Sequence, residues 1–194
     1  RTRMQWGMTQ EPTAILTALN YFCQNVDSQI RIKEIGMCAG PENLVQRNGL
    51  VIGASPDAVI LYPNNSRIEA LEVKNHCPFV SNHKNSPKWF NETHQFRVSV
   101  RHAPAEVAPW YVPQLMMEMV CLGPECRSAV MVRQTATKGA VILRLHRDDD
   151  WIEEMLHLLK RFKTEFVDCE TLPPKDFFWD VDAERYRDFV QKTK

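Results

Sequence analysis

The sequence predicts a mixed-sheet α/β domain with helices on both faces of the sheet. Short β-rich apolar runs occur in both halves of the chain, at residues 29–36, 50–54, 59–62, 70–74, 128–134 and 140–146. Helical patterns precede, separate and follow them, at 9–24, 111–122 and 148–167. A chain of 194 residues, 44% hydrophobic, suits one globular unit. We expect one domain over 1–194, with its core at about 4–167 and a C-terminal extension at 168–194.

The first helix is predicted by an apolar stripe at Ile15, Leu19 and Phe22, which continues the line of Glu11. Pro12 fits the first turn of this helix, where a missing N–H costs little. Glu11 would then lie near the positive end of the helix dipole. The dipole alone is a sufficient structural reason for Glu11.

The strands form two expected hairpins. One runs from 50 to 74 and closes at residues 63–65, and the other joins 128–134 to 140–146 through a turn at 137–139. Between them, residues 80–109 read as a long loop that either covers a ligand or is a plain insertion, with Trp89 and Phe90 on a short helix. The helix at 111–122 places Gln114 and Glu118 four residues apart on one side.

The C-terminal third begins with three aspartates, 148–150, which most simply cap a helix. The extension carries Phe177, Phe178 and Trp179, which should pack on the body or on a partner, followed by a charged helix.

Charge and cysteine content narrow the class of protein. The formal net charge is zero and the pI is about 7.2, so nucleic-acid binding would need a local basic patch. The candidates lie in one stretch, Lys84, Lys88, Arg97, Arg101 and His102. Six cysteines without a CxxC pair indicate reduced thiols in an intracellular protein of cytoplasm or nucleus. No apolar run approaches the ~20 residues of a membrane span, and a targeting segment before Arg1 stays open.

The residues that carry chemistry are Asp57, Glu72 and Lys74. In a strand, residues two apart face the same side, so Glu72 and Lys74 would face one site while Val73 faces away. The hairpin would bring Asp57 beside Glu72. This acid–acid–lysine set is typical of metal-dependent phosphodiester cleavage, in which carboxylates hold Mg²⁺ or Mn²⁺ and a lysine of lowered pKa serves the attacking water. The alternative is an ordinary hairpin with solvated acids and a surface lysine.

Further segments in the same order favour the chemical interpretation. They are Trp6-Gly7 with Glu11, Ser55-Pro56-Asp57, Leu71-Glu72-Val73-Lys74, Cys77-Pro78-Phe79 and Gln114. With these blocks the chain resembles the lambda exonuclease-like nucleases, also called the YqaJ-type viral recombinase family, within the PD-(D/E)XK nucleases. The resemblance spans at least residues 4–120 and implies a restriction-endonuclease-like fold.

The resemblance also implies roles for individual residues. Asp57 and Glu72 would ligate the metal with the Val73 carbonyl, and Lys74 would serve the attacking water. Gln114 would place that water or the scissile phosphate, and Glu11 would reach the metal directly or through water. Ser55 and Arg3 would contact DNA.

The sequence departs from the family pattern in two places. Ala58 follows Asp57 where the family usually has glycine, and Asn75-His76 lengthens the exit from the strand toward Phe79. The family's contacts to a DNA 5′ end come from a stretch before Trp6-Gly7, and only five residues precede Trp6 here. Recognition of a 5′ phosphate is therefore not carried over.

The functional expectation is a metal-dependent DNA exonuclease, 5′→3′ on duplex ends, in recombination or DNA end processing. The resemblance is compatible with a ring-shaped homo-oligomer and a recombination partner protein. Three alternatives stay open: a DNA endonuclease, an RNA endonuclease, and a non-catalytic DNA-binding module on the same fold.

Overall fold

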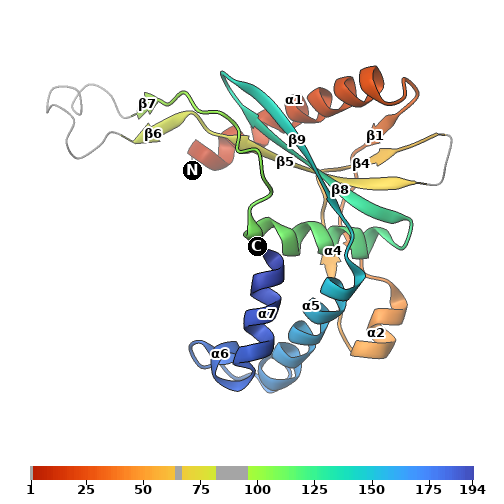
Figure 1. Cartoon of the computed structure of the whole chain (residues 1–194), viewed down its shortest axis with the longest axis vertical. Helices are drawn as coiled ribbons and strands as arrows, with labels where there is room; N and C mark the ends of the chain where they lie inside the picture. Colours follow the sequence, from red (N-terminus) through yellow and green to blue (C-terminus); the bar gives the residue numbers. More distant parts are fainter. Residues whose placement is uncertain (1, 64–66, 82–95) are drawn as a thin grey trace, which may run out of the picture.

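The computed structural model describes residues 2–63, 67–81 and 96–194, and its centre is a five-stranded mixed sheet (Figure 1). The strand order is β1-β4-β5-β8-β9, in which β5 and β8 are parallel and the other neighbours are antiparallel. These strands are β1 (Arg31–Lys33), β4 (Ala58–Leu61), β5 (Ile68–His76), β8 (Cys126–Thr135) and β9 (Gly139–His146). With helices on both faces, the expected mixed α/β class is confirmed.

One face of the sheet is covered by α1 (Thr2–Asn25). The helix buries Ala14, Ala18 and Phe22 against Leu71 of β5 and Val130 of β8. These are the odd-numbered positions of β5 and the even-numbered positions of β8, as expected for side chains that alternate between the faces of a sheet. The other face of β5 is therefore left for a different set of residues.

The opposite face is covered by η1 (Pro109–Tyr111), α4 (Val112–Leu122) and α5 (Asp149–Phe162), which continues as a π-helical turn at Lys163–Val167. Leu115 and Met119 of α4 pack with Met131 of β8 and Trp151 of α5. Figure 1 shows α1 and α4 on opposite sides of the sheet, with α5 beyond α4. The even-numbered residues of β5 consequently look toward α4.

The C-terminal helices α6 (Phe177–Val181) and α7 (Ala183–Thr193) fold back against α5. Phe189 stacks on Trp151 with 4.7 Å between ring centroids, and Phe177 meets Phe166 edge to face at 4.6 Å. Asp148 caps α5 by accepting a hydrogen bond from the Trp151 backbone N–H at 2.9 Å. The expected cap is confirmed, and so is packing of the tail on the body for Phe177, whereas the rings of Phe178 and Trp179 contact Tyr186 of the extension itself.

Glu69 of β5 forms a buried ionic cluster on the α1 side of the sheet. It is 0% exposed, and its oxygens accept hydrogen bonds from Tyr62, Arg67, Ser128 and Arg144. Burial raises the pKa of Glu69, but these four partners outweigh burial and leave that pKa below its ordinary value. The buried Glu69 carboxylate therefore receives its hydrogen bonds from other side chains of the same chain.

The predicted start of the first helix is wrong. The helix begins at Thr2, so Pro12 lies in its interior and Glu11 is beyond the first turn, where the dipole has little effect. The proline removes the hydrogen bond that a backbone N–H would donate to the carbonyl of Met8, a residue that is 72% exposed. Pro12 alone was a poor marker for the start of the helix, because the residues from Thr2 to Glu11 are helical as well.

The expected hairpin from 50 to 74 is shorter than predicted. Only β4 and β5 form it, and of 50–54 only β3 (Gly53–Ala54) is a strand, paired with β2 (Cys38–Ala39) outside the main sheet. The helix α2 (Glu42–Asn48) was not predicted. Leu50 is instead buried in the core on the α4 side.

The segment 80–109 is not one long loop. It begins within β6 (Phe79–Ser81) and contains β7 (Phe96–Val98), and these two strands pair antiparallel. The expectations for Lys84, Lys88, Trp89 and Phe90 fall outside the described residues. Within the described ranges no helix is both long enough and apolar enough to cross a membrane, and all six cysteines are free thiols.

Candidate functional site

Asp57, Glu72 and Lys74 lie together on the α4 side of the sheet. Ala58 pairs with Leu71, so Asp57, one residue earlier, falls beside Glu72. The Val73 backbone N–H donates a hydrogen bond of 2.7 Å to Asp57 Oδ2, which fixes that carboxylate at the strand edge. Lys74 Nζ donates to Glu72 Oε1. The two acids and the lysine therefore form one site at the junction of β4 and β5.

A third acid, Glu118 of α4, belongs to this site and had been given no role from the sequence. It is 1% exposed, and its Oε1 accepts a hydrogen bond of 2.9 Å from Gln114 Nε2. Its Oε2 receives no hydrogen bond from an N–H group or a hydroxyl, and a hydrogen bond to Glu72 forms when one of the two acids is protonated. Burial, followed by the charge of Glu72, raises the pKa of Glu118 to about 8. The four-residue spacing from Gln114 was the one visible signal that α4 presents a polar pair to the sheet.

The electrostatics of the site show crowded negative charge. Burial raises the pKa of Asp57 to about 6, with a further contribution from the charge of Glu72. Glu72 is 3% exposed and its Oε2 is buried without a hydrogen-bond partner. A buried carboxylate oxygen without a partner is costly, so these acids are arranged for something other than stability.

The expectation of a lowered pKa for Lys74 is wrong. Burial does lower it, but the hydrogen bond and charge of Glu72 and the charge of Asp57 raise it, and the net pKa lies above the ordinary value. The Lys74 ammonium also lies 5.2 Å from the centre of the Tyr111 ring. Lys74 is therefore a cation paired with Glu72, which does not fit the ready proton acceptor that the sequence suggested.

The donor set fits a hard divalent cation. The fit is indicated by the unpartnered oxygens of Glu72 and Glu118 and by the raised pKa of Asp57, because a cation would relieve both. No three His, Cys, Asp or Glu side chains in the described ranges close around an ion by themselves. Two carboxylates with a main-chain carbonyl, completed by water and substrate, match the way proteins bind Mg²⁺.

The remaining predicted residues lie at different distances from these acids. Glu11, half-buried on α1, is close enough for its charge to raise the pKa of Asp57. Gln114 is exposed and reaches the site through Glu118. Ser55 is exposed and its hydroxyl donates to the Met37 sulfur at 3.5 Å. Arg3 is exposed near the start of α1, and among the described residues no ion pair joins it to the acids.

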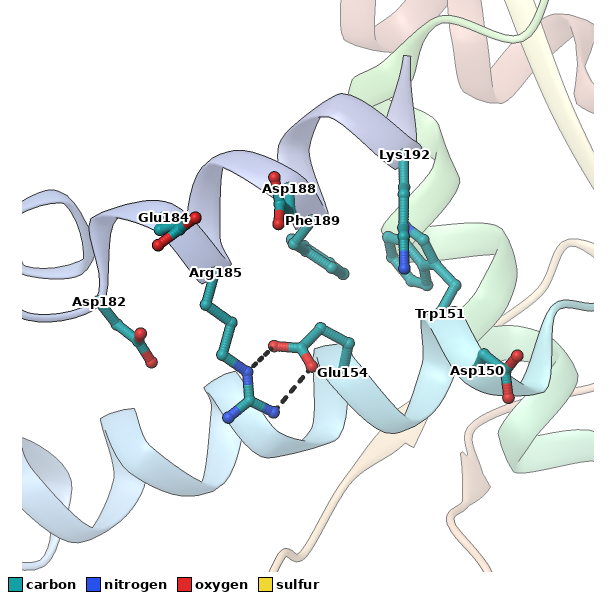
Figure 2. Close-up of a pocket in the computed structure, with 9 residues that line it drawn as sticks. All are labelled: Asp150, Trp151, Glu154, Asp182, Glu184, Arg185, Asp188, Phe189 and Lys192. Atoms are coloured by element: carbon teal, nitrogen blue, oxygen red, sulfur yellow. Dashed lines mark hydrogen bonds and ion pairs between the residues drawn. The ribbon is translucent and has the colours of Figure 1, made fainter.

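A separate cleft of about 390 Å³ lies between α5 and α7 (Figure 2). Its floor is formed by the Trp151–Phe189 stack, and Arg185 binds both oxygens of Glu154 at 2.6 and 2.8 Å. The remaining lining residues are mostly acidic, namely Asp150, Asp182, Glu184 and Asp188, with Lys192. The cleft shares no residue with the acid–lysine site, and its arginine and central acid satisfy each other.

Comparison with known proteins gives structural matches only. No family model matches the sequence, and neither does any curated protein. A crystal structure of LHK-Exo in complex with dAMP matches with a TM-score of 0.54 and 19% identity, covering 85% of this chain and 68% of that one. A crystal structure of the alkaline exonuclease LHK-Exo from Laribacter hongkongensis matches with a TM-score of 0.49 and 17% identity, covering 88% and 74%. The first match confirms the restriction-endonuclease-like fold, a mixed central sheet flanked by helices.

Proposed function

We propose that the chain is a metal-dependent DNA nuclease of the lambda exonuclease-like group within the PD-(D/E)XK nucleases. One observation carries the proposal: Asp57, Glu72 and the unforeseen Glu118 converge on the α4 side of β5 next to Lys74, with two carboxylate oxygens unpartnered. The fold supports it, because a chain with the same architecture is an exonuclease crystallised with dAMP. A single nucleotide is what exonucleolytic cleavage releases, so exonuclease action on duplex ends is the form of activity proposed.

In this mechanism Asp57 and Glu72 would hold Mg²⁺ or Mn²⁺ with the Val73 carbonyl. When bound, such a cation supplies charge stabilisation to a phosphodiester and lowers the pKa of a coordinated water. Asp57 is held for this task by the Val73 N–H. Lys74, kept cationic by Glu72, orients the attacking water or a phosphate oxygen. Gln114 orients Glu118 through its amide, and Glu11 adds negative charge from α1.

The other roles belong to the same proposal. Ser55 and Arg3 are proposed DNA contacts, and recombination or end processing is the proposed setting, with a ring-shaped homo-oligomer and a recombination partner as accompanying hypotheses. The whole of residues 1–194 would act as one nuclease domain within the cell.

The test compares cleavage of end-labelled linear duplex DNA with that of a closed circle, in Mg²⁺ or in EDTA. Lys74→Ala is the informative variant, and Lys138→Ala, an exposed lysine on the β8–β9 turn, is the matched control. We expect metal-dependent loss of the linear DNA alone, abolished in Lys74→Ala and retained in Lys138→Ala, with the label reporting polarity. Cutting of the circle would make the protein an endonuclease. Failure of the folded wild type to cut either DNA would favour the DNA-binding module.

A further inference from the structure

Arg133 of β8 is a buried cation that has no acidic partner among the described residues. It is 5% exposed, and its Nη1 donates to the Glu106 carbonyl at 2.8 Å, while its Nε has no hydrogen-bond partner. None of the ion pairs in the described ranges includes it. Burying an unpaired guanidinium is expensive, so a residue of this kind is retained when an anion from outside the chain completes it.

Two further basic side chains approach Arg133. His76, at the end of β5, and Arg101, on the segment that follows β7, come close enough that both arginines and burial hold the pKa of His76 below its ordinary value, with burial as the largest cause. The buried Nε2 of His76 also has no partner. A small pocket of about 10 Å³ beside His76 and Arg101 is also lined by the hydroxyl-bearing residues Ser99, Thr135 and Thr137, and Arg133 lies outside its lining. We name His76, Arg101 and Arg133 the basic cluster.

The basic cluster continues the acid–lysine site along the sheet. Arg133 pairs in register with Lys74, and Thr135 with His76, across the parallel strands. Glu72, Lys74 and His76 alternate by two and face the same side, at roughly 6–7 Å per step. The Tyr111 ring lies between the two cations, 5.2 Å from Lys74 Nζ and 5.9 Å from the Arg133 guanidinium. One face of β5 and β8 thus runs from clustered acids to clustered bases.

We propose that the basic cluster, centred on Arg133, binds the backbone phosphate next to the one that is cleaved. A guanidinium with a free edge is suited to a phosphate because its N–H groups match two phosphate oxygens. His76 and Arg101 add donors from neighbouring elements, so the phosphate would complete three groups that have no acid beside them in the part of the chain that the structure describes. This inference rests on the proposed nuclease function and adds a position on the substrate to it.

The experiment uses Arg133→Gln, with Arg133→Lys to restore charge and Arg127→Gln as the control. Arg127 is an exposed arginine near the opposite end of β8, paired with Asp149. Binding of a short labelled duplex is measured in EDTA by fluorescence anisotropy at several salt concentrations. We expect Arg133→Gln to weaken DNA binding by about tenfold. The slope of log binding constant against log salt concentration should become shallower by about one. Arg133→Lys should recover part of the affinity and the slope.

A steady-state assay in Mg²⁺ separates binding from chemistry. Arg133→Gln should raise KM about tenfold while kcat stays within about threefold, whereas Lys74→Ala should lower kcat. If Arg133→Gln fails to fold, the exposed Arg101→Gln carries the same test with a smaller effect. Folded variants with wild-type affinity and salt slope would overturn the phosphate subsite.

The subsite and the proposed function can fail separately. Titration with dAMP and with deoxyadenosine compares the same base and sugar with and without a phosphate. If the wild type binds DNA, and binds dAMP more tightly than deoxyadenosine, but cleaves no DNA, the nuclease proposal fails and a phosphate site remains. If the wild type cleaves DNA and Arg133→Gln keeps the same preference for dAMP, the subsite fails and the nuclease remains.

Discussion

Two buried glutamates three residues apart on β5 have opposite environments. Glu69 faces α1, is 0% exposed, and has four hydrogen-bonding partners that hold its pKa down. Glu72 faces α4, is 3% exposed, and keeps one oxygen without a partner, beside Asp57 and Glu118 whose pKa values are raised. Equal burial therefore says little about role. A buried acid whose bonds are complete stabilises the fold, and one whose bonds are incomplete is available to a ligand.

The sharpest test of this contrast is activity. Glu72→Gln should reduce metal-dependent cleavage of linear duplex by roughly 10³-fold, because the cation loses a charged ligand. Its free energy of unfolding in EDTA should change less than in Glu69→Gln, because the lost ion pair with Lys74 is offset by relief of the repulsion from Asp57 and Glu118. Cleavage rates and urea denaturation check the two halves. A Glu72→Gln protein within tenfold of wild-type activity would remove Glu72 from the metal site.

The matched variant on the other side of β5, Glu69→Gln, should lower stability and leave activity unchanged. Glu69→Gln leaves Arg67 and Arg144 facing a neutral group and should lower the free energy of unfolding by roughly 2–4 kcal/mol. The loss is set below that of a fully buried pair because the two arginine side chains are 40% and 37% exposed. Activity per folded molecule should be unchanged. Urea denaturation with active-site titration measures both, and unaltered stability would show that the cluster is dispensable.

The hydrogen-bonded cluster around Glu69 should also make the stability of the protein depend on acid. Because the pKa of Glu69 is lowered on folding, its stabilisation is present above the ordinary glutamate pKa of 4.5 and is lost as pH falls through the folded value. Melting temperature should therefore fall more steeply below about pH 4.5 in the wild type than in Glu69→Gln. Scanning calorimetry between pH 3 and pH 7 would show this as two curves that converge toward acid pH, and parallel curves would contradict it.

The smallest effect is expected at the cleft between α5 and α7. Glu154→Gln removes the bidentate ion pair with Arg185, which lies on a partly exposed surface. Such pairs contribute little, so the free energy of unfolding should drop by at most about 1 kcal/mol and cleavage should be unaffected. A large loss of nuclease activity in Glu154→Gln would mean that this cleft takes part in function.

The parts of the site that the sequence could predict are local. Glu72 and Lys74 share a face because strand side chains alternate by two, and Asp57 joins them because a short hairpin connects β4 to β5. Glu118 and Arg133 could not be placed in this way. Their positions depend on how the chain returns from β5 through α4 to β8, and neither periodicity nor spacing reports that path. The pKa of Lys74 was mispredicted for a related reason, since its sign depends on Glu72, Asp57 and Tyr111 together with burial.

The accuracy of the fold prediction followed the strength of each pattern. The long helices and the strands of the central sheet have repeated apolar positions, and these were found. The short elements α2, β2 and β3 have two to seven residues and too few positions to show a period. The start of α1 was misplaced because Pro12 was taken as a boundary, whereas the helix begins at Thr2 and Pro12 lies on its exposed side.

The parallel pairing of β5 with β8 has a consequence for the order in which parts of the protein fold. The two strands are separated in the chain by everything from Cys77 to Glu125, and contacts of that separation form slowly because a large loop must close first. Asp57 and Glu72 can meet early through their hairpin, whereas Glu118 and Arg133 arrive only when this loop has closed. Because the proposed metal ligands Asp57 and Glu72 already meet in the early hairpin, bound Mg²⁺ should accelerate refolding more than it slows unfolding.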